Sequence, residues 1–333
     1  MTPGRGALLG SLTVALAASL FGMLGVLSRT AYEFGLSPFA LVAWRAGVGA
    51  IATAGFVAWR LRRGGRLVGW RSLDGRGRGS LGLAALMGAT LNMAMFLAFA
   101  RVPVAIVLLC FYLYPALVAG ASAVLGWERL DRPRIIALLI ALAGMVAVVV
   151  GGPSSGTDGG LDLLGVALSL SAALSQAIFV LVSRHGYRAV PTDQATGVIL
   201  VGSALIAGAL AVAGDGAASL TLPFSDSALL GLLLFAGLFA AAVPSFLFLS
   251  GIRWIGPVRA GILMLFEPFV GVALAAIFLA EAVGPVQAAG GAAILAAAVI
   301  LQRSSPSEPA LMPAAEPEPE VEVELAGREV ASS

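Results

Sequence analysis

Lysine is absent from this chain of 333 residues, and all 20 of its basic residues are arginines. A P-loop ATPase needs the lysine of its phosphate-binding loop and a retinal protein needs a lysine for its Schiff base, so the chain alone is neither. The single cysteine, Cys110, excludes an internal disulfide, and the single histidine, His185, argues against a histidine-based metal site. The sequence therefore disfavours an enzyme and predicts neither a cofactor nor a metal ion.

Charge is also scarce: 11% of the residues are charged, 59% are apolar, and the mean hydropathy is +0.98. An average soluble domain is about 25% charged, so there is too little charge here to cover a water-facing surface. The apolar residues form ten runs of about 20 residues, the length that crosses a bilayer as a helix. We expect an all-α integral membrane protein with spans near 7–28, 37–59, 81–100, 103–125, 134–151, 163–183, 192–213, 227–250, 257–280 and 285–302.

The arginines predict the orientation, because cytoplasmic connections carry the excess of basic residues. In a ten-span arrangement Arg29 and Arg101 fall on one side and nearly all other arginines fall on the opposite side. We therefore expect a multi-pass protein of the cell (inner or plasma) membrane with both termini cytoplasmic. The connection after the second span holds seven arginines and Trp70; orientation and anionic-lipid contact explain this composition better than nucleic acid, which we do not expect as a partner.

The last segment, 303–333, differs from the rest of the chain. It is rich in proline and holds seven glutamates, from Glu308 to Glu329. Such a composition cannot bury enough apolar surface to fold, so we expect a disordered cytoplasmic tail.

An internal repeat organises the remainder. Corresponding residues in the two halves lie 153 or 155 positions apart, and the matched sites are Ser28-Arg29 with Ser183-Arg184, Pro115 with Pro268, and Glu128 with Glu281. A unit of five spans is odd, so the second copy would enter the membrane upside down relative to the first. We therefore expect two inverted five-helix repeats, 7–151 and 163–302, the architecture of many secondary transporters.

The residues that carry the repeat also resemble a known family. The resemblance rests on Pro38, Trp44-Arg45, Ala50, Pro115, Gly126 to Leu130, Glu267-Pro268 and Glu281. Together these residues look like the two EamA domains of the drug/metabolite transporter superfamily, over about residues 7 to 302. The resemblance implies a ten-helix secondary transporter of small metabolites with cytoplasmic termini. The chain departs from it where Leu200 stands at the counterpart of Arg45, so the two halves are not chemically interchangeable.

Glu267 is the first candidate for substrate binding or coupling. It lies ten residues into the ninth span, about 15 Å along a helix and so near the middle of a core about 30 Å thick. A carboxyl group at that depth can carry a proton for coupled transport. The alternative is a protonated or arginine-paired glutamate that only locks the helix packing.

Pro115 and Pro268 lie within corresponding spans, and each removes a helical hydrogen bond. The carbonyl groups freed near Phe111 and Met264 could line a cavity, and matched helix interruptions in two halves point to the binding site. Either proline alone could instead only shape the bundle.

Arg45 lies deep in the second span, where an arginine costs about 2.5 to 3.5 kcal/mol and must be paired or hydrated. It could bind a substrate carboxylate, pair with Glu267, or hold helix carbonyl groups. Asn92, Gln176 and Tyr114 are secondary candidates for substrate contact, although interhelical hydrogen bonds or packing would also account for them.

Glu128 and Glu281 close corresponding spans, so they could form a latch or be interfacial residues only. The fifth and tenth spans carry Gly144 and Gly290-Gly291, small residues that allow close helix approach, and these spans offer a homodimer contact.

The sequence as a whole favours a secondary active exporter of a small-molecule substrate, coupled to a proton or driven by the solute gradient. The alternative is a non-transporting membrane scaffold or lipid-handling protein.

Overall fold

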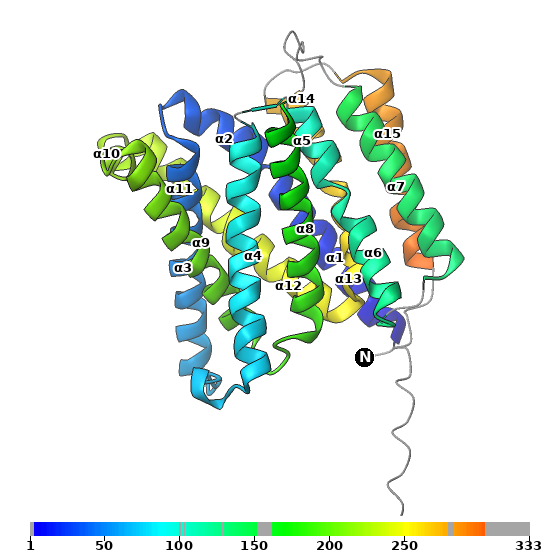
Figure 1. Cartoon of the computed structure of the whole chain (residues 1–333), viewed down its shortest axis with the longest axis horizontal. Helices are drawn as coiled ribbons and strands as arrows, with labels where there is room; N and C mark the ends of the chain where they lie inside the picture. The colour runs from blue at the N-terminus through cyan, green and yellow to red at the C-terminus, as the bar shows by residue number, and fades with distance from the viewer. Residues whose placement is uncertain are drawn as a thin grey trace, which may run out of the picture.

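The computed structural model describes residues 3–99, 101–102, 104–127, 130–151, 162–278 and 283–303. All regular elements within this described part are helical, and they run roughly alongside one another (Figure 1). The α-helices are α1 (Pro3–Gly22), α2 (Leu24–Glu33), α3 (Pro38–Arg62), α4 (Gly75–Phe99), α5 (Val104–Phe111), α6 (Tyr114–Val124), α7 (Arg132–Val150), α8 (Leu163–His185), α9 (Thr192–Asp215), α10 (Ala218–Thr221), α11 (Ser227–Gly237), α12 (Val243–Ile255), α13 (Pro257–Met264), α14 (Phe266–Phe278) and α15 (Pro285–Arg303). Two short 3₁₀ segments are η1 (Trp70–Ser72) and η2 (Leu222–Ser225), and a π-helix, η3 (Leu238–Ala242), joins α11 to α12.

Polar caps explain where several helices begin. The Ser37 side chain accepts a hydrogen bond from the amide of Ala40, and Pro38 occupies the first turn of α3. The helix α4 begins six residues before the predicted span, because Asp74 accepts a hydrogen bond of 2.8 Å from the amide of Gly77. Hydropathy alone does not register such a cap.

Eight helical stretches of the described chain are long and apolar enough to cross a bilayer. They are 6–33, 38–62, 107–124, 132–150, 163–185, 192–215, 227–255 and 257–274. The 25-residue α4 stands beside α8 in Figure 1, and the apolar part of α15, 285–300, is a shorter apolar helix. An all-α membrane architecture is therefore confirmed, and the number of ten spans stays a prediction.

Three of the long helices are interrupted. The helix pair α5 and α6 is broken by a turn at Tyr112 and Leu113, and the pair α13 and α14 by a turn at Leu265. The interruptions thus begin after Phe111 and Met264, the positions that Pro115 and Pro268 predict. A third break, at Met23 between α1 and α2, has no proline and was not predicted; the predicted first span stops five residues before α2 ends at Glu33.

The helix contacts come in matched pairs. The helix α1 packs on α12 as α8 packs on α4, and α3 packs along α9, α6 against α13 and α7 along α15. Each of these contacts joins a helix of one half to a helix of the other, and the α1–α12 and α4–α8 contacts are counterparts of each other. Figure 1 shows the α7–α15 pair at one edge of the bundle and the α3–α9 pair towards the other.

Glycines set the close approach of α7 and α15. A Cβ atom at Gly144 would lie 2.7 Å from the Gly290 carbonyl oxygen, so the small-residue faces predicted for a dimer are packed on each other within the chain. A homodimer through these two helices stays a prediction. It would have to use their outer faces, where Leu139 and Val299 are 61% and 51% exposed.

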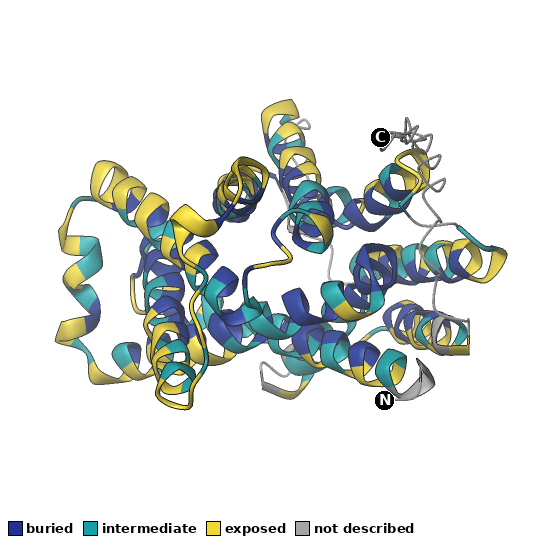
Figure 2. Cartoon of the chain, turned by 90° about the horizontal axis from the view of Figure 1, so that it is seen from below, coloured by how far each residue is buried: buried dark blue, intermediate teal, exposed yellow. Residues whose placement is uncertain are grey.

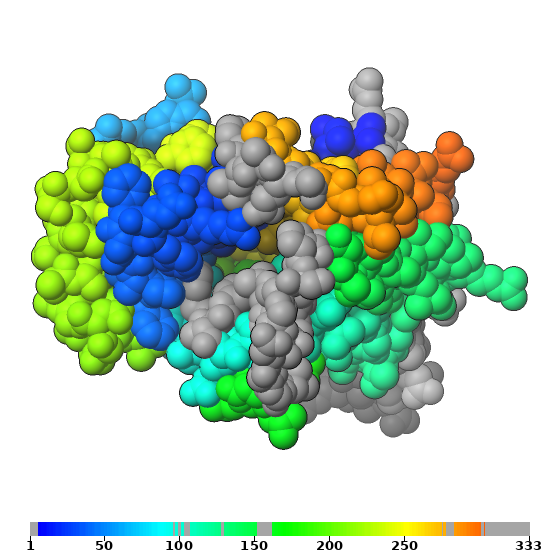
Figure 3. Space-filling model, turned by 90° about the horizontal axis from the view of Figure 1, so that it is seen from above, coloured from blue at the N-terminus to red at the C-terminus, as the bar shows by residue number. Residues whose placement is uncertain are grey.

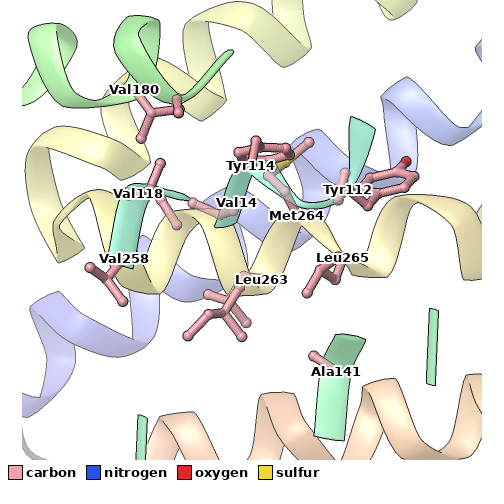
Figure 4. Packing of buried hydrophobic residues seen from close by; sticks show 14 of the residues in the cluster. Val14, Tyr112, Tyr114, Val118, Ala141, Val180, Val258, Leu263, Met264 and Leu265 are labelled. Carbon is pink, nitrogen blue, oxygen red and sulfur yellow. The ribbon is translucent and has the colours of Figure 1, made fainter. Parts of the chain in front are cut away.

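Buried residues gather on the helix sides that face the interior of the bundle, and exposed residues lie on the outer sides (Figure 2). The largest apolar cluster lies where α6 meets α8 and α13. In Figure 4, Val118 of α6 lies between Val180 of α8 and Val258 of α13. This packing holds the interrupted helices of both halves against each other and places their breaks at the centre of the molecule.

Polar contacts tie helix ends together at both ends of the bundle. Near the α3–α4 connection, Arg60 pairs with the buried Asp193 at 2.6 Å. At the opposite end, Arg101 pairs with Asp162 at 3.1 Å. This hydrogen bond, together with one from the amide of Leu164, lowers the pKa of the partly exposed Asp162. Glu128, Glu281 and the tail after Arg303 lie outside the described residues, so the latch and the disorder of the tail stay predictions.

Candidate functional site

A cavity of about 190 Å³ lies between the two halves of the chain. Phe21 and Leu24 line it from the α1–α2 break, and Met264 and Glu267 line it from either side of the α13–α14 break. The lining is mainly apolar and aromatic, with a few polar groups, which is typical of a small-molecule site. Figure 3 shows a hollow in the upper face of the bundle, between the blue segment of α2 and α3 and the orange segment of α14 and α15.

Arg45 is held on one wall of the cavity by two hydrogen bonds. Its Nη1 donates to the carbonyl oxygen of Ala240 at 2.9 Å, and its Nη2 donates to Oδ1 of Asn92 at 2.8 Å. Asn92 is oriented in turn, since its Nδ2 donates to the Gly88 carbonyl oxygen at 2.7 Å. Arg45 and Asn92 both line the cavity, so a buried cation from α3 is fixed by α4 and by the π-helix η3.

The π-helix explains why a carbonyl group is available to Arg45. In a π-helix the hydrogen bonds run to the fifth residue instead of the fourth, so the ladder is locally disturbed, and such bulges recur at functional sites. Glycine at Gly49 favours the close contact between α3 and η3, because a Cβ atom there would lie 3.2 Å from the Ala241 Cβ atom and 3.3 Å from the Ala242 amide nitrogen. Pro244, the second residue of α12, follows directly.

Glu267 lies in the first turn of α14, just after the break at Leu265, and its side chain is half-buried because it faces the cavity. Its hydrogen-bond partner is Tyr112, which comes from the corresponding break between α5 and α6. Glu267 and Arg45 act on each other electrostatically, but these two described residues form no direct ion pair. The cavity thus presents one acidic and one basic group that remain separate.

The other predicted residues divide into two groups. Gln176 lines the cavity with Asn92, Arg45 and Glu267. Tyr114, Pro115 and Pro268 are buried outside its lining: Tyr114 lies beside Gln176 but its hydroxyl makes no hydrogen bond of good geometry. Phe111 and Met264, which stand four residues before the two prolines, both line the cavity.

Many lining residues form pairs separated by 153 to 155 positions, the offsets of the sequence repeat. These pairs are Phe21 with Gln176, Leu24 with Phe179, Arg45 with Leu200, Gly88 with Ala241, Asn92 with Ser245, and Phe111 with Met264. The two charged residues fit this spacing but differ from their counterparts in chemical character. The apolar Leu200 lines the cavity as the counterpart of Arg45, and the counterpart of Glu267 is the uncharged Tyr114.

Sequence reasoning missed part of the site. Thr196 and Ser203 of α9 line the cavity, and the buried Thr196 hydroxyl has no hydrogen-bond partner in the described part of the chain. The repeat does not point to Thr196, because at the offset of 155 that pairs Arg45 with Leu200 the counterpart of Val42 is Gly197. Nothing in the composition of residues 238–242 signals a π-helix.

Comparisons with known proteins agree with this arrangement. The EamA-like transporter family matches residues 8–150 and 163–303, which leaves little of the helical chain unmatched. One solved structure, titled only "Crystal structure of protein", superposes with a TM-score of 0.70 at 22% identity, over 87% of this chain and 95% of that one, and this likeness concerns the fold alone. No curated protein matches the chain. With two copies of the domain across most of its length, the chain belongs to the EamA-like transporter family, a family of membrane transporters and not of enzymes.

Proposed function

We propose that this membrane transporter is a secondary active exporter of small metabolites or drugs, with the central cavity as its substrate site and Glu267 as the group that couples export to a proton. The observation that carries the proposal is the pair of charged side chains in the cavity, Arg45 from the first half and Glu267 from the second. Ionisable groups within a membrane are costly and are functional by default. The family resemblance fits either export or import, and export is the direction that we propose.

Alternating access between two inverted repeats would operate this site. The paired helix contacts and the paired cavity residues support such a relation, because a two-fold axis through the cavity would generate both. The breaks at Tyr112–Leu113 and at Leu265 lie beside the cavity in corresponding helices, where rocking of one half against the other would be absorbed. Glu128 and Glu281, at the ends of the same two spans, remain the proposed latch.

The proposal includes ten spans, with α4 and α15 crossing the bilayer together with the eight candidate spans, and cytoplasmic termini at a cell membrane. We expect a reporter fused after Arg303 to be active only in its cytoplasmic form. The measurement is paired fusions of an enzyme that works in the cytoplasm and one that works only outside it. Activity of the second fusion would contradict both the even number of spans and the orientation.

Counterflow tests transport itself. Proteoliposomes are loaded with a metabolite mixture, diluted into trace labelled compounds, and compared with liposomes that hold the Arg45→Leu variant. We expect at least one compound to accumulate transiently in the wild type and about tenfold less in the variant, because loss of the cavity cation removes binding energy on the order of 1.4 kcal/mol or more. Comparison of metabolites inside and outside cells with and without the protein would then give the direction.

The second candidate from the sequence, a non-transporting scaffold or lipid-handling protein, is not favoured by the family match. This alternative predicts no counterflow of any solute. It also predicts that cysteines placed along the cavity cannot be reached by thiol reagents from either side of the membrane. Access from either side would instead agree with transport.

A further inference from the structure

The connection between α3 and α4 forms a basic and aromatic surface at one end of the bundle (Figure 1). We call residues 59–72 the hook. It contains five arginines and no acidic residue. Arg62, Arg63, Arg66 and Arg71 are exposed, and so are its large apolar side chains: Trp59, Leu67 and Trp70 are 49%, 52% and 55% exposed. Exposed tryptophan interleaved with arginine is a pattern that suits the membrane–water interface, where aromatic rings lie at the headgroup level and basic side chains meet anionic lipids.

The hook is held in a defined shape. Its fifth arginine, Arg60, donates to the Arg66 carbonyl oxygen at 2.9 Å and pairs with Asp193 of α9. The amide of Val68 donates to Oε1 of Gln194 at 3.0 Å, and the Gln194 amide donates back to the Val68 carbonyl oxygen at 2.7 Å. Because the backbone is anchored twice to α9, the exposed arginines are displayed on a rigid support.

The aromatic residues place the hook at the membrane surface. The helix α3 has 25 residues, about 37 Å at 1.5 Å per residue, so its last turn extends beyond a hydrocarbon core of about 30 Å. Trp59 stacks on Phe56 with ring centroids 5.5 Å apart, and the Arg63 guanidinium lies 4.6 Å from the Trp59 ring centroid. Tryptophan is the residue that favours the headgroup level of a bilayer.

We propose that the hook is a binding surface for anionic phospholipid headgroups. Guanidinium groups bind phosphate oxygens in a forked geometry that a lysine could not reproduce, and the neighbouring Trp70 and Leu67 would reach towards the acyl chains. The contacts with Asp193 and Gln194 join the hook to α9, whose next turns line the cavity. The inference stands on the hook alone and does not depend on the proposed transport function.

The test is fluorescence quenching in proteoliposomes made with brominated phosphatidylglycerol or brominated phosphatidylcholine. The hook signal is the difference between the wild type and the Trp59→Phe/Trp70→Phe variant. We expect phosphatidylglycerol to compete for the hook about threefold or more better than phosphatidylcholine, and we expect this preference to shrink as salt screens the charges. The variant Arg62→Gln/Arg63→Gln/Arg66→Gln should lower the ratio to about one.

The matched control removes three exposed arginines elsewhere, Arg132→Gln/Arg188→Gln/Arg303→Gln. This control changes the net charge by the same amount and should leave the preference for phosphatidylglycerol intact. An equal loss of the preference in both triple variants would show that it comes from the overall charge and not from a defined surface at the hook. A ratio near one in the wild type would overturn the proposal without any variant, so a misfolded triple variant leaves the test decisive. Binding of a labelled oligonucleotide to the hook in neutral nanodiscs, without a lipid preference, would point to nucleic acid instead.

Discussion

Glu267→Gln is expected to abolish transport driven by a pH gradient. The substitution keeps the shape of the side chain and its contact with Tyr112, but the amide can neither release nor take up a proton. In proteoliposomes that contain a pH-sensitive dye, we expect the gradient-driven rate to fall at least about tenfold and the remaining exchange to be the same between about pH 6 and pH 8. The substrate is the compound found by counterflow.

Two variants make this result specific. Glu33→Gln is the matched control, because Glu33 is an exposed glutamate at the end of α2 and makes no part of the cavity lining; it should transport like the wild type. Tyr112→Phe keeps the ring and removes only the hydroxyl partner of Glu267, so it should change the pH profile more than the maximum rate. Unchanged gradient-driven transport by Glu267→Gln would end the coupling role while leaving transport through the cavity possible.

Gly290→Ala is expected to destabilise the fold strongly for a change of one methyl group. The new Cβ atom would lie 2.5 Å from the Gly144 carbonyl oxygen and 2.8 Å from the Val148 amide nitrogen. Both are backbone atoms of α7 that no side-chain rotation can move, so the two helices must separate. Overpacking of this kind costs about 1 to 3 kcal/mol. The measurement is the melting temperature in detergent, followed by size-exclusion chromatography.

The control for Gly290→Ala is Gly208→Ala in α9, where a Cβ atom would meet nothing within 4 Å. Alanine favours the helix over glycine by about 1 kcal/mol, so this variant should melt at the same temperature as the wild type or above it. If both variants melted alike, the close approach of α7 and α15 would not be a determinant of stability.

The sequence predicts most of the helical layout because hydropathy and breaking residues are local signals. Pro115 and Pro268 predict the breaks after Phe111 and Met264. Gly256 separates the spans predicted at 227–250 and 257–280; it lies between α12 and α13, where its φ of +87° suits glycine. The family resemblance is confirmed, and Arg45, Asn92, Gln176 and Glu267 are brought together around one cavity.

Features that depend on long-range contacts could not be predicted in this way. Tyr112 becomes the partner of Glu267 only because two breaks 153 positions apart meet at the cavity. The π-helix at 238–242 depends on the packing of α3, whose Gly49 and Arg45 contact it. The residues within this segment give no sequence signal that distinguishes a π-helix from an α-helix. The same reason explains why Tyr114 is buried behind the cavity although its spacing matches Glu267.

The π-helix has a consequence for the resting protein. It lies in the second half, and the corresponding helix of the first half, α4, runs as a continuous α-helix over its described residues 75–99. If the two halves were identical, states open to either side of the membrane would have equal free energy and equal populations. Arg45 bonds to Asn92 in its own half and across to Ala240 in the other half, and its counterpart Leu200 has no side-chain group that could form the matching bonds. Each difference of about 1.4 kcal/mol between states shifts their ratio tenfold. We therefore expect the empty transporter to populate mainly the state that is open to one side of the membrane. Substrate binding then has to supply the free energy that shifts the protein to the other state.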